Sequence, residues 1–152
     1  MKRIAFFPGS FDPISRGHED IVLRALPLFD EIVVALGVNS SKSYMFSIDQ
    51  RLEWIKNTFA DYPQIKVVSY EGLTVKASEK HEANFILRGL RNSNDYEYEK
   101  SIALMNQEMA PNIETLYLNT APKWAAISST SIRDIIKNQG NTAPFLASGV
   151  QL

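Results

Sequence analysis

The 152-residue sequence contains no cysteine, which excludes disulfides, thiolate metal sites and a cysteine nucleophile. It also lacks long apolar runs. The first run ends before Pro8 and Gly9, too early for a signal peptide, and no other approaches the ~20 residues of a membrane span. A net charge of −1 provides no general basic surface for nucleic acid. We therefore expect a cytoplasmic protein that binds neither membrane nor nucleic acid and meets any anionic ligand with a local cluster of cations.

Two familiar phosphate-binding loops are missing as well, the Walker-type loop and the Gly-x-Gly-x-x-Gly turn, and no zinc motif is present. Residues 8–18, Pro-Gly-Ser-Phe-Asp-Pro-Ile-Ser-Arg-Gly-His, offer a different turn. They lie between a short apolar run and a segment with helical spacing, so Gly17 and His18 fall in the first turn of a helix. Unpaired N–H groups at a helix start attract phosphate, and glycine permits close approach. An imidazole there donates a hydrogen bond to a phosphoryl oxygen. This stretch indicates nucleotide chemistry.

Apolar, β-prone runs alternate with helical patterns along the whole chain. The expected strands are Arg3–Phe7, Glu31–Leu36, Ile65–Ser69, Asn84–Leu87 and Ile113–Leu118. Helices are expected around Val22–Phe29, from a capping box at Ser47–Gln50 to Phe59, and over Leu73–Lys80, Asp95–Met109 and Ser128–Asn138. This order predicts an α/β fold: a Rossmann-like, doubly wound, five-stranded parallel sheet with helices on both faces. No linker interrupts it, so we expect a single domain over residues 1–152.

Polar residues of interest follow four of the expected strands. Gly9 and Ser10 follow the first, Lys42 lies in the loop after the second, and segments 88–91 and 123–129 follow the fourth and fifth. Ligands of such sheets bind beyond the carboxyl ends of the strands. The sequence therefore predicts that these hydroxyls, cations and glycines converge at one edge of the sheet.

Arg88 and Arg91 are suited to phosphate because the planar guanidinium binds two oxygens at once. The alternative is a pair of surface arginines that form ion pairs with Asp95 or Glu97. Together with Lys42, the two arginines would meet a substrate that carries several phosphates. His81, between Lys80 and Glu82, is expected to be solvated and has no assigned role.

The segment Ile127–Arg133 contains four consecutive hydroxyl side chains at an expected helix start. One hydroxyl satisfies an N-cap, so a bound phosphate is one explanation of the others; ordinary capping is the alternative. Trp124 is a candidate for stacking on a base or for partial burial in the core. Asp12 and Glu99 are candidates for metal-linked or ribose contacts.

Together, Gly9-Ser-Phe-Asp-Pro, Gly17-His18, Lys42, Arg88–Arg91, Tyr98-Glu99 and Ile127–Arg133 resemble the bacterial phosphopantetheine adenylyltransferase family. The resemblance extends from Met1 to about Leu146. It implies that AMP passes from ATP to 4′-phosphopantetheine with Mg²⁺, giving dephospho-coenzyme A and pyrophosphate, in a penultimate step of coenzyme A synthesis. It also implies a homohexamer.

The resemblance assigns His18, Lys42 and Ser10 to catalysis. It implies that Ser10, Lys42, Thr74 and Arg88 hold 4′-phosphopantetheine, with Thr74 contacting it through the backbone. It implies that the ATP ligands are Ser10, Phe11, His18, Gly89, Leu90, Arg91, Glu99, Trp124, Ala125, Ala126, Ile127, Ser128, Ser129 and Thr130. One departure is Ser43-Tyr44, where the family often has Lys-Pro, which is expected to change the mobility of the loop.

The alternatives are a related nucleotidyltransferase acting on nicotinate mononucleotide or glycerol phosphate, and a non-catalytic adenylate-binding module. The segment Arg88–Arg91 and the short chain favour phosphopantetheine as the acceptor.

Overall fold

The computed structural model describes residues 1–152 and contains one five-stranded sheet in the order β3-β2-β1-β4-β5. Its strands are β1 (Ile4–Gly9), β2 (Glu31–Gly37), β3 (Ile65–Tyr70), β4 (Phe85–Leu90) and β5 (Glu114–Asn119). Every paired strand runs parallel to its neighbour, and the order reverses between β1 and β4. This confirms the predicted α/β, Rossmann-like class. A cleft at such a reversal lies beyond the carboxyl ends of the strands.

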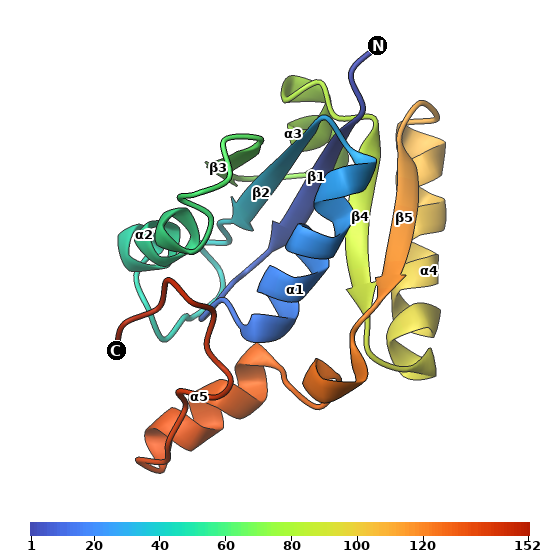
Figure 1. Cartoon of the computed structure of the whole chain (residues 1–152). Coiled ribbons are helices and arrows are strands. Elements are labelled where there is room, and N and C mark those ends of the chain that lie inside the picture. The colour runs from blue at the N-terminus through green and yellow to red at the C-terminus, as the bar shows by residue number, and fades with distance from the viewer.

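The helices are α1 (Arg16–Ala25), α2 (Ile48–Thr58), α3 (Thr74–Lys80), α4 (Ser93–Met109) and α5 (Ser129–Lys137). Figure 1 shows α1 and α2 on one side of the sheet and α3 and α4 on the other, with α5 below the carboxyl ends of the strands. No helix is both long and apolar enough to cross a membrane.

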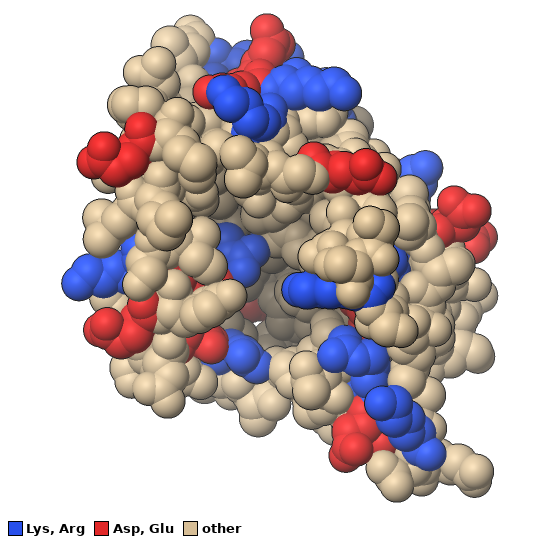
Figure 2. All heavy atoms as spheres, turned by 180° about the vertical axis from the view of Figure 1, so that it is seen from behind, with Lys and Arg blue, Asp and Glu red and all other residues tan.

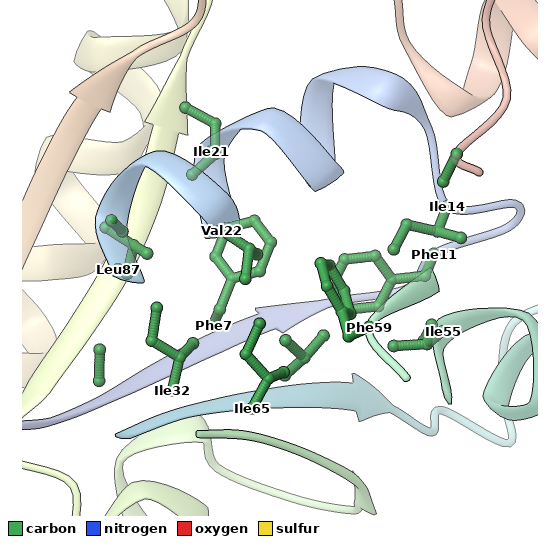
Figure 3. Close-up of a cluster of buried hydrophobic side chains, with 14 of the residues drawn as sticks. Phe7, Phe11, Ile14, Ile21, Val22, Ile32, Ile55, Phe59, Ile65 and Leu87 are labelled. Atoms are coloured by element: carbon green, nitrogen blue, oxygen red, sulfur yellow. The ribbon is translucent and has the colours of Figure 1, made fainter. Parts of the chain in front are cut away.

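The largest core cluster lies between the sheet and helices α1 and α2. Figure 3 shows Phe7 and Ile32 of the sheet facing Val22 of α1, with Ile55 and Phe59 closing one end. These side chains are almost fully buried, and burial of each stabilises the fold by roughly 1.5–3 kcal/mol. The core thus fixes the start of α1 relative to the end of β1, which is where residues 8–18 lie.

Several element boundaries differ from expectation. Strand β1 continues through Gly9 and β4 through Leu90, so Gly9, Arg88 and Gly89 lie within strands and not after them. Helix α1 ends at Ala25, where a short 3-10 helix with Pro27 begins. At Ser47 the capping box is half formed: the Ser47 hydroxyl accepts from the Gln50 N–H, but the Gln50 amide turns to Glu53.

Candidate active site

Two cavities meet at the carboxyl ends of β1 and β4. The first, called here the Lys42 cavity, has a volume of about 280 Å³, and the second, the His18 cavity, about 310 Å³. They share Pro8, Gly9, Ser10, Arg88 and Glu99. Seen from behind, the molecule is hollowed in its middle, with Lys and Arg side chains around the hollow (Figure 2). The predicted convergence of separate segments at one edge of the sheet is therefore confirmed.

His18 is held at the start of α1 by Ser15, the N-cap residue. The Ser15 N–H donates to His18 Nδ1 at 3.0 Å, and the Ser15 hydroxyl accepts from the His18 N–H at 3.3 Å. Because Nδ1 accepts a hydrogen bond, a neutral ring carries its proton on Nε2, which has no partner in the protein. The Phe11 ring packs edge-on against the imidazole at 5.1 Å. This arrangement leaves one oriented donor on the wall of the His18 cavity.

The pKa of His18 is lowered from 6.5 to about 4, chiefly by desolvation in the surrounding protein and to a smaller extent by the positive charges of Arg88 and Arg91. The imidazole is thus neutral at physiological pH in the free protein. A neutral Nε2–H is a fixed donor that accepts no proton as the pH moves between 5 and 9.

We predict that the His18 imidazole titrates near pH 4 in an NMR titration of the free protein. Between that value and 6.5 the unfolded chain binds a proton that the folded protein does not, so the free energy of unfolding decreases as the pH falls through this window. The variant His18→Asn should lose this contribution to the pH dependence. A His18 midpoint near 6.5 would contradict the description of the ring as desolvated.

Arg88 is anchored at the boundary of the two cavities by a paired carboxylate. Its Nε and Nη2 donate to the two carboxylate oxygens of Glu99 at 3.0 and 2.7 Å, and Nη1 donates to the Pro8 carbonyl at 2.7 Å. Glu99 is 9% exposed. The geometry fixes the plane of the guanidinium, and its remaining N–H groups face the cavities. Glu99 therefore contacts an arginine, and its predicted contact with ATP stays a prediction.

The Lys42 cavity brings together Ser10, Lys42, Thr74 and Arg88, the four residues predicted to hold 4′-phosphopantetheine. Lys42 is exposed and forms no ion pair within the protein. The Thr74 hydroxyl lies 3.0 Å from the Tyr70 hydroxyl, while its backbone begins α3, where the N–H groups are unpaired. The expectation that position 74 acts through its backbone stays a prediction. Sequence reasoning missed Tyr70 and Asn106, which also line this cavity.

Part of the predicted ATP set lines the His18 cavity: Ser10, Phe11, His18, Gly89, Arg91, Glu99, Ile127, Ser128 and Ser129. Leu90, Trp124, Ala125, Ala126 and Thr130 line neither cavity. Trp124 lies near two cations instead, with Lys123 Nζ at 4.7 Å and the Arg16 guanidinium at 5.6 Å from the ring.

Arg91 forms the ion pair that the sequence offered as the alternative to phosphate binding. It donates to Asp95 through Nε, Nη2 and its backbone N–H. Desolvation alone would raise the pKa of Asp95, but the hydrogen bonds from Arg91 outweigh it and lower that pKa.

The hydroxyl-rich start of α5 is explained without a ligand, which corrects one argument from the sequence. Ser128 and Ser131 form a reciprocal capping box. The Ser129 hydroxyl donates to the Pro13 carbonyl at 2.8 Å, and the Thr130 hydroxyl accepts from Arg133 at 3.2 Å. The hydroxyls thus have protein partners, and their number is no sign of phosphate. What this helix start offers the His18 cavity is its backbone N–H groups.

The suggestion that Asp12 makes a metal-linked or ribose contact is also corrected. The buried carboxylate of Asp12 accepts from the N–H groups of Met45 and Phe46 at 2.9 and 3.0 Å, so it is a structural group and no metal ligand. No group of three or more His, Cys, Asp or Glu side chains gathers as a metal site. The acidic side chains at the cavities, Glu99 and Asp95, are both paired with arginines.

Comparisons with known proteins fit this geometry. Residues 6–135 match the model of the cytidylyltransferase-like family, so the chain is a member of this class of nucleotidyltransferases. Phosphopantetheine adenylyltransferase of Flavobacterium johnsoniae is 49% identical over 99% of this chain and 98% of its own. The enzyme of the same name from Christiangramia forsetii is 51% identical over 93% of this chain and 92% of its own.

The chain belongs to the phosphopantetheine adenylyltransferase family. The family predicted from the sequence is therefore confirmed. A bifunctional NMN adenylyltransferase/ADP ribose pyrophosphatase from Francisella tularensis shares the fold, with a TM-score of 0.71 at 16% identity. The match covers 99% of this chain and 46% of that protein.

Proposed function

We propose that this enzyme transfers AMP from ATP to 4′-phosphopantetheine, giving dephospho-coenzyme A and pyrophosphate, as a single domain over residues 1–152. The observation that carries the proposal is the pair of cavities that share Ser10 and Arg88. Two anionic substrates bound in adjoining cavities meet at a cation and a hydroxyl. The match covers 98% and 99% of the length of two relatives named for this reaction, which supports the choice of acceptor.

The acceptor belongs in the Lys42 cavity and ATP in the His18 cavity. Lys42 and Arg88 bring two charges to the acceptor phosphate, and Thr74 adds the N–H groups of a helix start. Beside His18, the starts of α1 and α5 direct backbone N–H groups toward the triphosphate. Arg91 and the backbone N–H of Ser129 hold the β- and γ-phosphates, which leave together.

The reaction needs no protein base. The terminal phosphate of the acceptor has a second pKa near 6 and is largely a dianion at pH 7. One of its oxygens attacks the α-phosphorus in line, and the bond from that phosphorus to the β-phosphate oxygen breaks. Lys42 and Arg88 offset the repulsion between the two anions. The His18 Nε2–H and the Ser10 hydroxyl donate to the α-phosphoryl oxygens as their charge grows.

We propose Mg²⁺ as the counter-ion of ATP, held by phosphate oxygens and water. Such coordination suits Mg²⁺, which keeps several waters beside substrate phosphates. The carboxylates at the cavities are engaged with arginines, so no side chain is assigned to the ion.

We propose further that the enzyme acts in the cytoplasm, where ATP is supplied, and assembles as a homo-oligomer, a hexamer by family resemblance. Helix α4 exposes Tyr98, Ile102, Met105 and Met109 at spacings of four, three and four residues, which place them on one face. An apolar helical face of this kind supports self-association.

The proposal is tested by incubating the protein with ATP, with and without Mg²⁺, and one acceptor at a time: 4′-phosphopantetheine, nicotinate mononucleotide or glycerol phosphate. We expect pyrophosphate release with 4′-phosphopantetheine and Mg²⁺. Release with another acceptor in its place would indicate the related nucleotidyltransferase. ATP binding with no release for any acceptor would indicate an adenylate-binding module.

A further inference from the structure

Arg51 of α2 is a buried charge that touches neither cavity. Its side chain is 1% exposed and lines neither the Lys42 nor the His18 cavity. Nη1 donates to the Ser10 carbonyl at 2.8 Å, and Nε donates to the carbonyls of Phe46 and Ser47 at 3.0 and 3.4 Å. A guanidinium is suited to such a task because its donors point in fixed, divergent directions. Arg51 thus ties the Gly9-Ser10 turn to the far end of the loop that carries Lys42.

The same loop is held by two further contacts. The ring of Tyr44 covers the Arg51 guanidinium at 4.1 Å from the ring centre, a cation–π geometry. The Asp12 carboxylate accepts from the N–H groups of Met45 and Phe46. Tyr44 is two residues from Lys42 and lines the same cavity, whereas residues 40–43 are exposed. The part of the loop that Arg51 and Asp12 hold therefore begins at Tyr44, two residues after the lysine.

We propose that Arg51, with Tyr44 stacked on its guanidinium, is a positioning residue that holds the Lys42 loop at a fixed place relative to Ser10. The inference rests on the proposed function, in which Lys42 binds the acceptor phosphate and Ser10 lies where the two cavities meet. Without the contacts of Arg51 and Tyr44, the Lys42 ammonium samples a wider volume and contributes less to acceptor binding. ATP binding depends on the starts of α1 and α5, which Arg51 does not contact.

Two substitutions of Tyr44 and one of Arg51 test the proposal. Tyr44→Leu removes the aromatic face, Tyr44→Phe keeps it, and Arg51→Lys keeps the charge but loses the forked donors. Ser43→Ala is the matched control, since Ser43 is exposed and lines neither cavity. For each variant, KM for both substrates and kcat are measured, together with hydrogen exchange of the Met45 and Phe46 amides.

We expect Tyr44→Leu and Arg51→Lys to raise KM for 4′-phosphopantetheine by about five- to tenfold and KM for ATP by less than about twofold. Both should accelerate exchange of the Met45 and Phe46 amides. Tyr44→Phe and Ser43→Ala should behave as wild type. If Arg51→Lys does not fold, the two Tyr44 variants decide.

The proposal is overturned if Tyr44→Leu leaves amide exchange unchanged, if it raises both KM values equally, or if Tyr44→Phe behaves like Tyr44→Leu. The last result would mean that the tyrosine hydroxyl contacts the substrate directly. Absence of pyrophosphate release by the wild-type enzyme would instead refute the proposed function, and the exchange measurement would still decide whether Arg51 and Tyr44 fix the loop.

Discussion

Replacing His18 with alanine should lower kcat by roughly 10²–10³-fold, the loss typical of one oriented oxyanion donor. The reason is geometric: the Ser15 N–H fixes Nδ1 as an acceptor, which leaves the Nε2 proton to meet charge that develops on the α-phosphoryl group. KM for either substrate should change little, because the contact strengthens only in the transition state. Steady-state kinetics with both substrates varied provides the measurement.

Loss of the imidazole also removes the acceptor of the Ser15 N–H, so a stability effect must be separated from a catalytic one. His18→Asn offers the control, because the asparagine Oδ1 takes the place of Nδ1 in the cap but puts no donor at the position of Nε2. We expect this variant to keep the melting temperature of the wild type and to be as slow as His18→Ala. Turnover within about threefold of wild type in either variant would remove His18 from the mechanism.

Replacing Arg88 with alanine should raise KM for 4′-phosphopantetheine by about tenfold or more and destabilise the protein by about 2–3 kcal/mol. Two effects add here. The acceptor phosphate loses a cation at the boundary of the cavities, and Glu99 is left as an unpaired carboxylate that is 9% exposed. Kinetics and denaturant unfolding of the same variant measure the two effects.

A second variant separates them. Arg88→Gln combined with Glu99→Gln removes both charges and keeps groups able to hydrogen-bond, so most of the lost stability should return. KM for the acceptor should stay high, since the cation is still missing. An acceptor KM equal to that of wild type in the double variant would show that Arg88 serves the fold alone.

The parallel five-stranded sheet and the α/β class followed from the sequence because buried parallel strands are continuous apolar runs, as in Ile32–Leu36. The end of β4 at Leu90 could not be predicted from the sequence. Arg88 interrupts the apolar run, and its place in the strand depends on the Glu99 carboxylate of α4 and the Pro8 carbonyl. Gly89 has no side chain that signals a strand, yet an added Cβ would lie 3.0 Å from Ile21 of α1. Both are tertiary contacts that no local pattern reports.

The site was predictable to the extent that parallel strands carry their loops to one edge. That rule located Ser10, Lys42 and Arg88 correctly. It failed where a polar side chain has a distant partner: the Ser129 hydroxyl bonds to Pro13, 116 positions away along the chain. The importance of Arg51 was hidden for the same reason, since the Ser10 carbonyl lies 41 positions from it.

The central claim is that an oxygen of the acceptor phosphate attacks the α-phosphorus of ATP at the junction of the two cavities. It is tested by giving the wild-type enzyme unlabelled ATP and 4′-phosphopantetheine whose phosphate oxygens carry ¹⁸O, and by measuring both products by mass spectrometry. Dephospho-coenzyme A should retain all of the label, including one oxygen in the new bridge, and pyrophosphate should contain none. Loss of one ¹⁸O from dephospho-coenzyme A would mean that the phosphorus of the acceptor, and not the α-phosphorus of ATP, is attacked, and would contradict this mechanism.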